Sequence, residues 1–341
     1  MKVLVALGGN AMTAPDGSAG PEDQIAAVRA AMSSVADLIA DGVDVVLTHG
    51  NGPQVGNLLV KNELSAAVVP PVPLDWCGAQ TQATLGFVLM NALEAALAER
   101  GVRRPVATIV TRTLVDSDDA GFDNPSKPIG RYLPQREAAA LIDHGQTFED
   151  RGERGWRRVV PSPEPREILD AAAVATLMAD GFVVVANGGG GIPVVREPDG
   201  TLRGVEAVID KDLGATVLAR GLRVDRLVIA TDVSNAVVGF GTSDAKPLGE
   251  VSVDMLRSYA AEGHFASGSM GPKVDAVCRF VEASGKQGVI TSLHNIVPGV
   301  RGIAGTIVVP DRAGGFGSTD LQDDAGVPQP SSPQTEEDAH A

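Results

Sequence analysis

Short apolar segments alternate along this chain with longer amphipathic ones. Six of the short segments are rich in Val, Ile and Leu and predict strands near residues 2–7, 43–48, 105–110, 182–187, 226–231 and 304–309. Strands that are apolar along their whole length are typical of a parallel sheet with both faces covered. The pattern therefore predicts an α/β protein, an αβα sandwich with a mainly parallel central sheet.

The amphipathic segments predict helices that end at glycine. The clearest begins at Pro21, with two acidic residues in its first turn, carries an apolar stripe from Ile25 to Ile39, and ends before Gly42. Comparable helices are expected at 76–100, 165–180, 212–220 and 273–284, each followed by a glycine. This regularity supports the layered sandwich.

Two segments depart from the alternation. Residues 112–163 are rich in proline and charge, and predict a small protruding subdomain or lid, because so long a loop usually has structure or function of its own. A variable surface insertion is the alternative that composition leaves open. Residues 311–341 carry seven acidic residues and one arginine, and predict a disordered acidic tail after a folded domain of residues 1–310.

Charge and cysteine content exclude several functions. A net charge of −15 argues against nucleic-acid binding, which depends on clustered Lys and Arg. Cys77 and Cys278 have neither disulfide-framework nor zinc-site spacing. No segment reaches the roughly 18 apolar residues of a membrane span, and the apolar run at Met1–Leu7 is too short for a signal peptide. A cytoplasmic protein without membrane partners is expected.

Glycine-rich turns follow three of the predicted strands. They are Gly8-Gly9-Asn10, HGNGPQ at 49–54 and NGGGG at 187–191. One such turn is common between a strand and a helix, but three at the carboxyl ends of parallel strands predict a shared site for a polyanion. None is a Walker A loop or a GxGxxG dinucleotide fingerprint, and the HRD and DFG elements of protein kinases are absent from the sequence.

Three lysines stand in unusual settings. Lys127 lies between prolines, Lys211 between two aspartates, and Lys273 after Gly271-Pro272. Phosphoryl transfer needs cations placed around the transferred group, and lysine supplies a compact point charge. The aspartates could orient Lys211 or take part in Mg²⁺ coordination. A solvated surface charge is the alternative for each lysine alone.

Seven segments in order resemble the carbamate kinases, a branch of the amino acid kinase family. The likeness covers about residues 1–310. The segments are ALGGNA at 6–11, THGNGPQVGN at 48–57, NPSKPIG at 124–130, RRVVPSPEP at 157–165, NGGGGIPV at 187–194, GVEAVIDKDL at 204–213 and EGHFASGSMGPKVDA at 262–276.

The resemblance implies a role for each matching residue. Carbamate and the transferred phosphoryl group are assigned to Gly8, Gly9, Asn10, Gly50, Asn51 and Gly52. Lys127 matches a catalytic lysine on a protruding subdomain that reaches over the active site. Lys211 and Lys273 match lysines that contact the nucleotide phosphates.

Three further residues complete the implied site. Asp210 matches an acid that orients the catalytic lysines. Asp232 and Met270 lie in segments similar to nucleotide-binding loops of the family. The protein ligands of a metal are left unknown, and Mg²⁺ is expected to be held mainly by the phosphates of ATP or ADP.

The implied reaction is reversible phosphoryl transfer between ATP and carbamate by a homodimer, run toward ATP synthesis in catabolism. Another amino acid kinase, similar to acetylglutamate kinase or to a phosphonate-antibiotic kinase, is one alternative. A non-catalytic binding member of the fold is another, although it would be expected to lose the lysines present here. Trp76, where the family commonly has a smaller residue, and the acidic tail depart from the family pattern.

Overall fold

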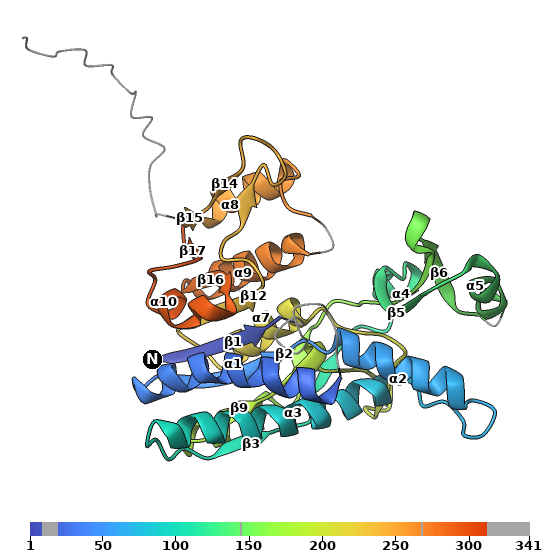
Figure 1. Ribbon diagram of the computed structural model, residues 1–341, viewed down its shortest axis with the longest axis horizontal. Helices are drawn as coiled ribbons and strands as arrows, with labels where there is room; N and C mark the ends of the chain where they lie inside the picture. Colours follow the sequence, from blue (N-terminus) through green and yellow to red (C-terminus); the bar gives the residue numbers. More distant parts are fainter. Residues whose placement is uncertain (9–19, 144, 267–268, 312–341) are drawn as a thin grey trace, which may run out of the picture. The chain divides into compact units, whose positions relative to one another are not determined.

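The computed structural model describes residues 1–8, 20–143, 145–266 and 269–311 (Figure 1). The chain divides into a unit of Met1–Asp311 and a unit of Arg312–Ala341, and the second unit lies outside the described residues. The expected acidic tail therefore stays a prediction. None of the described helices combines the length and the apolar character needed to cross a membrane.

An eight-stranded sheet forms the centre of the first unit. Its order is β15-β17-β16-β12-β1-β2-β9-β3. The strands are β1 Lys2–Leu7, β2 Asp44–His49, β3 Val106–Thr108, β9 Val183–Val185, β12 Arg226–Thr231, β15 Glu250–Ser252, β16 Gln287–Ser292 and β17 Thr306–Val309. Every neighbouring pair is parallel except β16 and β17. The mainly parallel sheet is confirmed.

Helices cover both faces of this sheet. Val3, Val5 and Leu7 of β1 join one buried cluster, whereas Leu4 and Ala6 join the other, because successive side chains of a strand point to opposite faces. The first cluster includes α1 (Pro21–Ala40), α3 (Leu74–Glu99) and α10 (Ile296–Val300); the second includes α6 (Ala171–Ala179), α7 (Lys211–Gly221), α8 (Val253–Ala261) and α9 (Met270–Ser284). The αβα sandwich is confirmed.

Residues 112–163 form structure of their own. A three-stranded antiparallel sheet combines β5 (Lys127–Leu133), β6 (Thr147–Asp150) and β7 (Trp156–Val160). An apolar cluster with α2 (Gly52–Ser65) includes Val55 and Leu59 of that helix, Ile129 of β5 and Val160 of β7. The segment that carries Lys127 is thus packed against the helix that follows the second glycine turn.

The remaining elements are short. They are α4 (Ala120–Asp123), α5 (Gln135–Ile142), a sheet of β4 (Arg112–Leu114), β8 (Glu167–Ile168), β10 (Ile192–Arg196) and β11 (Leu202–Gly204), a hairpin of β13 (Val237–Val238) and β14 (Lys246–Pro247), and the 3₁₀ turns η2 (Gly152–Arg154), η3 (Gly188–Gly190) and η4 (Leu293–Asn295).

The element predictions were wrong in some places. The helix expected at 165–180 begins only at Ala171, because Glu167–Ile168 pairs as β8 with β4. The central strand β16 was missed, although Val289 and Ile290 carry its apolar character. Helices α2 and α8 were missed as well.

Candidate active site

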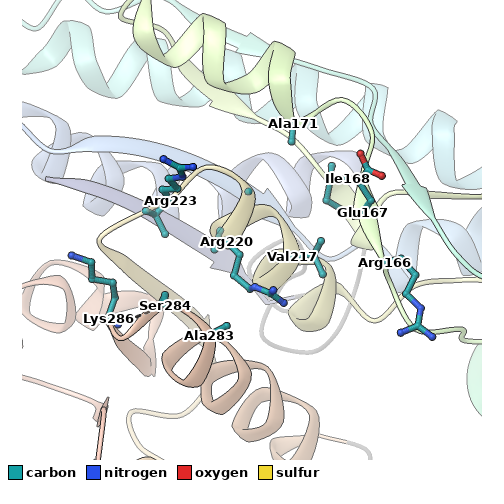
Figure 2. Close-up of a pocket in the computed structure, with 13 residues that line it drawn as sticks. Arg166, Glu167, Ile168, Ala171, Val217, Arg220, Arg223, Ala283, Ser284 and Lys286 are labelled. Carbon is teal, nitrogen blue, oxygen red and sulfur yellow. Dashed lines mark hydrogen bonds between the residues drawn. The ribbon is translucent and has the colours of Figure 1, made fainter. Parts of the chain in front are cut away.

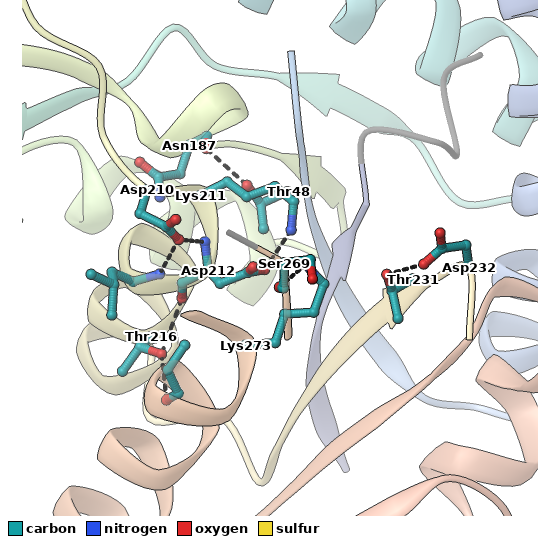
Figure 3. Close-up of polar contacts among 12 residues, drawn as sticks. Thr48, Asn187, Asp210, Lys211, Asp212, Thr216, Thr231, Asp232, Ser269 and Lys273 are labelled. Carbon is teal, nitrogen blue, oxygen red and sulfur yellow. Dashed lines mark hydrogen bonds and ion pairs between the residues drawn. The ribbon is translucent and has the colours of Figure 1, made fainter. Parts of the chain in front are cut away.

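The second and third glycine turns meet at one edge of the central sheet. They follow β2 and β9, which are adjacent and parallel. Thr48 Oγ1 donates a hydrogen bond to the carbonyl oxygen of Asn187 over 2.8 Å, which ties the two turns together (Figure 3). Gly8, at the end of β1, donates its N–H to the carbonyl oxygen of Ala230 over 2.7 Å. Gly9 and Asn10 lie outside the described residues.

Glycine is required where these turns approach each other. Gly189 has φ +66°, and a Cβ there would lie 2.2 Å from Nδ2 of Asn51. Gly190 has φ +89°, and its Cβ would lie 2.8 Å from Cβ of Ile209, the residue before Asp210. The backbone of the third turn therefore packs directly on the Asn51 side chain and on the segment that leads into α7.

His49 fills the space between the same two turns. Its ring is fully buried, and Nδ1 lies 3.0 Å from the carbonyl oxygen of Gly50. Burial lowers the pKa of His49 to about 4, against a smaller opposing effect of the Gly50 hydrogen bond. The imidazole is therefore neutral at pH 7, and Nδ1 carries the proton that it donates to Gly50.

All three lysines singled out in the sequence line one cavity of about 220 Å³. Lys127 comes from β5, Lys211 begins α7, and Lys273 lies in the first turn of α9. Gly50, Asn51 and Gly52 of the second turn line the same cavity, as does Asp210. Elements far apart in the sequence thus bring three ammonium groups and a glycine turn together.

Asp210 connects the first lysine to the start of α7. Its Oδ2 lies 2.5 Å from Nζ of Lys127, and its Oδ1 accepts the N–H groups of Asp212 and Leu213 over 2.9 and 3.3 Å. Burial alone would raise the pKa of Asp210, but the charges of Lys127 and Lys211 and these hydrogen bonds lower it. The carboxylate is therefore ionised, and caps the helix while it fixes Lys127.

Asp212 holds the other two lysines. Its side chain is 3% exposed and pairs with Nζ of Lys211 through Oδ1 and with Nζ of Lys273, at 3.5 Å, through Oδ2 (Figure 3). Lys273 Nζ also donates to the carbonyl oxygen of Ser269 over 3.2 Å. Without a shared carboxylate the two ammonium groups would repel each other, so Asp212 sets their separation.

The cluster is suited to an anion that carries several negative oxygens. Three ammonium groups face two carboxylates in the cavity, which leaves one positive charge in excess. Glycine turns add backbone N–H groups at the carboxyl ends of parallel strands, where anions bind in open α/β sheets. Chemically, the arrangement can bind phosphate groups and stabilise charge on a transferring phosphoryl group.

Comparison with known proteins decides the family. The family model described as "Amino acid kinase family" matches residues 1–292. Carbamate kinase from Thermococcus kodakarensis is 47% identical over 312 residues, which cover 90% of this chain and 99% of that protein. The chain belongs to the carbamate kinase family.

Solved structures of this family share the fold. Carbamate kinase from Giardia lamblia bound to AMP-PNP is 40% identical, with a TM-score of 0.86 over 91% of this chain and 98% of that one. The Giardia lamblia enzyme has also been solved after thiocarbamoylation by disulfiram on a cysteine, with a TM-score of 0.84 over 91% of this chain and 99% of that one. The carbamate kinase fold thus extends over nine-tenths of the chain.

Two residues expected on the nucleotide side of a carbamate kinase site are not among those that line the lysine cavity. Asp232 follows β12 and accepts a hydrogen bond from Oγ1 of Thr231 over 2.9 Å (Figure 3). Met270, the first residue of α9, packs against the buried cluster of α7 and α9. Neither lines the cavity that holds Lys127, Lys211 and Lys273. Their nucleotide-binding roles stay predictions.

The sequence predicted Asp212 only as one of two carboxylates that could orient Lys211 or take part in Mg²⁺ coordination, and its pairing with Lys273 was missed. The two carboxylates around Lys211 were visible in the sequence, but only the fold shows which lysines each one contacts. Asp210 binds Lys127, and Asp212 binds Lys211 and Lys273. The signal in the sequence was the alternation Asp-Lys-Asp at a predicted helix start. Among the described residues, no group of three or more His, Cys, Asp or Glu side chains is arranged to hold a metal ion.

Proposed function

We propose that this chain catalyses reversible phosphoryl transfer between ATP and carbamate, giving ADP and carbamoyl phosphate. The observation that carries this proposal is the cavity in which three lysines from three elements face a glycine turn. The relatives that match nine-tenths of the chain are carbamate kinases, and this is the reason for choosing carbamate as the acceptor. The same residues explain why neither a Walker A loop nor a catalytic nucleophile is needed.

The chemistry follows from charge placement. Carbamate arrives with its acceptor oxygen already deprotonated, so no general base is required. The transferring phosphoryl group spreads negative charge over its equatorial oxygens, and fixed cations stabilise that charge in the transition state. Lys127 approaches from β5 and Lys211 and Lys273 from α7 and α9, so the cations surround the group from different sides. Asp210 and Asp212 hold them in place before substrate binds.

The residues divide into an acceptor side and a nucleotide side. We assign carbamate and the transferred group to Gly8, Gly9, Asn10, Gly50, Asn51 and Gly52. Lys211 and Lys273 are assigned to the nucleotide phosphates, with Asp232 and Met270 farther along the nucleotide. Residues 112–163 act as the lid that brings Lys127 over the acceptor.

Mg²⁺ enters as part of the nucleotide substrate. Asp210 and Asp212 are both engaged by lysines, and Asp210 also caps α7, so neither offers a free pair of oxygens to a metal ion. The nucleotide phosphates are therefore proposed as its main ligands. The protein's own contribution is to place the lysines against the same phosphate oxygens.

Three further features belong to the proposal. Carbamoyl phosphate is a mixed anhydride of high transfer potential, so the reaction is proposed to run toward ATP in catabolism. The enzyme is proposed to be a cytoplasmic homodimer, as its family resemblance implies, and light scattering measures that state. Residues 311–341 are proposed to be a disordered tail without a catalytic part, and removing them should leave turnover unchanged.

A panel of acceptors tests the substrate assignment. ADP release from ATP is measured with carbamate, acetylglutamate and a phosphonate as separate acceptors. Carbamate alone should support turnover, because the relatives that match nine-tenths of the chain are carbamate kinases. Turnover with acetylglutamate or the phosphonate but not with carbamate would overturn the proposal.

A further inference from the structure

A second cavity lies at the far ends of the helices that carry the active-site lysines. It measures about 680 Å³, and its lining includes Arg166, Arg220, Arg223 and Lys286 (Figure 2). An adjoining cavity of about 280 Å³ shares Arg166 and Arg220 and adds Arg279. We call these two cavities, with these five residues, the basic groove. Lys211 begins α7, whereas Arg220 lies in its last turn, so the groove is separate from the active site.

The basic groove gathers basic side chains on an acidic protein. Five basic side chains line it against two acidic ones, Glu164 and Glu167, although the whole protein has a net charge of −15. Like charges gathered in a concave surface raise the local potential and concentrate counter-ions there. Asp116, Asp225 and Asp275 pair with three of these cations, so the positive charge that remains open to an anionic ligand is that of Arg220 and Arg223.

Two of the arginines have no carboxylate partner in the described part of the chain. Arg166 pairs with Asp116 at 2.7 Å, Arg279 pairs with Asp275 at 2.9 Å and also with Glu164, and Lys286 lies 4.0 Å from Asp225. The exposed side chains of Arg220 and Arg223, by contrast, form neither an ion pair nor a hydrogen bond with any described residue. Each guanidinium thus offers five N–H donors to a ligand.

The position of Arg220 makes it the centre of the groove. Figure 2 shows it between Arg166 on one side and Arg223 with Lys286 on the other. A cation near a helix C-terminus also stabilises the helix dipole, and this accounts for Arg220 in the last turn of α7. The helix dipole does not account for Arg166, which lies outside α7, directly before β8.

The floor of the groove suits a small organic molecule. Ile168, Val217 and Val224 line it beneath the basic rim. A volume of about 680 Å³ falls within the range of small-molecule sites, which combine apolar walls with a few charged groups. Arginine binds phosphate through two parallel hydrogen bonds, a geometry that it also offers to a carboxylate.

From these observations we infer that the basic groove is a second anion site, which binds a phosphorylated small molecule through Arg220 and Arg223. This site is separate from the proposed phosphoryl-transfer reaction. It uses the carboxyl-terminal ends of α7 and α9, whereas the reaction uses their amino-terminal ends.

Calorimetric titration with inorganic tripolyphosphate tests the inference. Wild-type protein should bind tripolyphosphate at two sites per chain, the lysine cavity and the basic groove. The variant Arg220→Gln with Arg223→Gln should lose affinity at one site by about tenfold or more, since charge-assisted hydrogen bonds are removed. Its kinase turnover should be unchanged, because neither arginine lines the active-site cavity.

A matched pair of substitutions controls for total charge. Arg29→Gln with Arg196→Gln removes the same charge from two exposed arginines outside the groove, and should leave both sites intact. Lys211→Ala should weaken only the other site. A single site in wild-type protein, or a groove variant that binds tripolyphosphate as wild type does at both sites, would overturn the inference whatever the kinase assay shows.

Discussion

Two aspartates organise the candidate site at the scale of single residues. Asp210 and Asp212 are two positions apart, yet one fixes Lys127 of β5 and the other fixes Lys211 and Lys273. Both carboxylates are largely buried, where an ion pair is weakened little by solvent. Removing either one leaves lysines that are still present but no longer held in position.

Replacing Asp212 with Asn tests whether Lys211 and Lys273 must be held in place, since the variant keeps both lysines. Asp212→Asn keeps the size of the side chain but removes the charge shared by Lys211 and Lys273, so kcat should fall by about 100-fold. Steady-state kinetics of ATP formation measure the effect, with circular dichroism to confirm folding. Asp180→Asn, a change in an exposed residue at the end of α6, is the control and should have full activity. Wild-type kcat in Asp212→Asn would show that the shared carboxylate has no positioning role.

His49 predicts a pH dependence of stability. Its pKa is about 4 in the folded protein, below the ordinary value near 6.5 that applies when the chain is unfolded. The unfolded state therefore binds more protons between these values, so stability is fully present above pH 6.5 and falls as the pH drops toward 4. The lost contribution is at most about 3 kcal/mol.

Urea unfolding at several pH values between 7 and 4.5 measures this loss of stability. Wild-type protein should lose more free energy of unfolding over that interval than His49→Gln, which has no imidazole to protonate. Other groups titrate equally in both proteins, so the difference isolates His49. Identical pH profiles for the two proteins would contradict a buried neutral imidazole.

At the scale of elements, close packing of the third glycine turn against Ile209 positions the start of α7. Gly190 and Gly200 both have positive φ, +89° and +85°, but only at Gly190 would a Cβ meet other atoms, 2.8 Å from Ile209. Gly190→Ala should therefore displace the segment that leads into Asp210 and α7, whereas Gly200→Ala should bear backbone strain alone, about 1 kcal/mol.

The two alanine variants form a matched pair. Gly190→Ala should lower both the thermal midpoint and kcat, and Gly200→Ala should lower the midpoint slightly with kcat unchanged. Differential scanning calorimetry and the ATP-formation assay measure both quantities. Equal kcat losses in the two variants would mean that the Gly190 contact with Ile209 does not position the site.

The sequence predicted local elements better than the contacts between them. Strands β1, β2, β9 and β12 are continuous apolar runs, so their positions follow from residue type. Strand β16 is interrupted by Gly288, whose missing side chain lets Val277 of α9 approach closely, and that reason exists only in the folded protein. The glycine turns and lysines were visible for the same local reasons. Asp212 was visible beside Lys211, but its contact with Lys273 was not, because that partner lies 61 residues away.

The buried thiols give a prediction for the whole molecule. Cys77 and Cys278 are the only cysteines of the chain, and both are buried. Burial raises the pKa of the Cys278 thiol to about 12 and also raises that of Cys77, so little reactive thiolate is present at neutral pH. The Giardia lamblia enzyme, by contrast, was thiocarbamoylated by disulfiram on a cysteine.

Thiol titration with a chromogenic disulfide tests this difference. Native protein at pH 7.5 should react slowly at both cysteines, and denaturant should expose two thiols per chain. Disulfiram should then leave the kinase activity intact under native conditions. Rapid native reaction of either thiol would show that the packing around it opens readily.

A coupled assay for ATP formed from ADP and carbamoyl phosphate tests the central claim most directly. Wild-type protein should make ATP. Lys211→Ala, which removes a cation from the cavity, should lose about 100- to 1000-fold in rate while remaining folded. Lys61→Ala, a change in an exposed lysine on α2, should retain full activity. No ATP from the wild-type protein, or undiminished ATP formation by Lys211→Ala, would contradict this account.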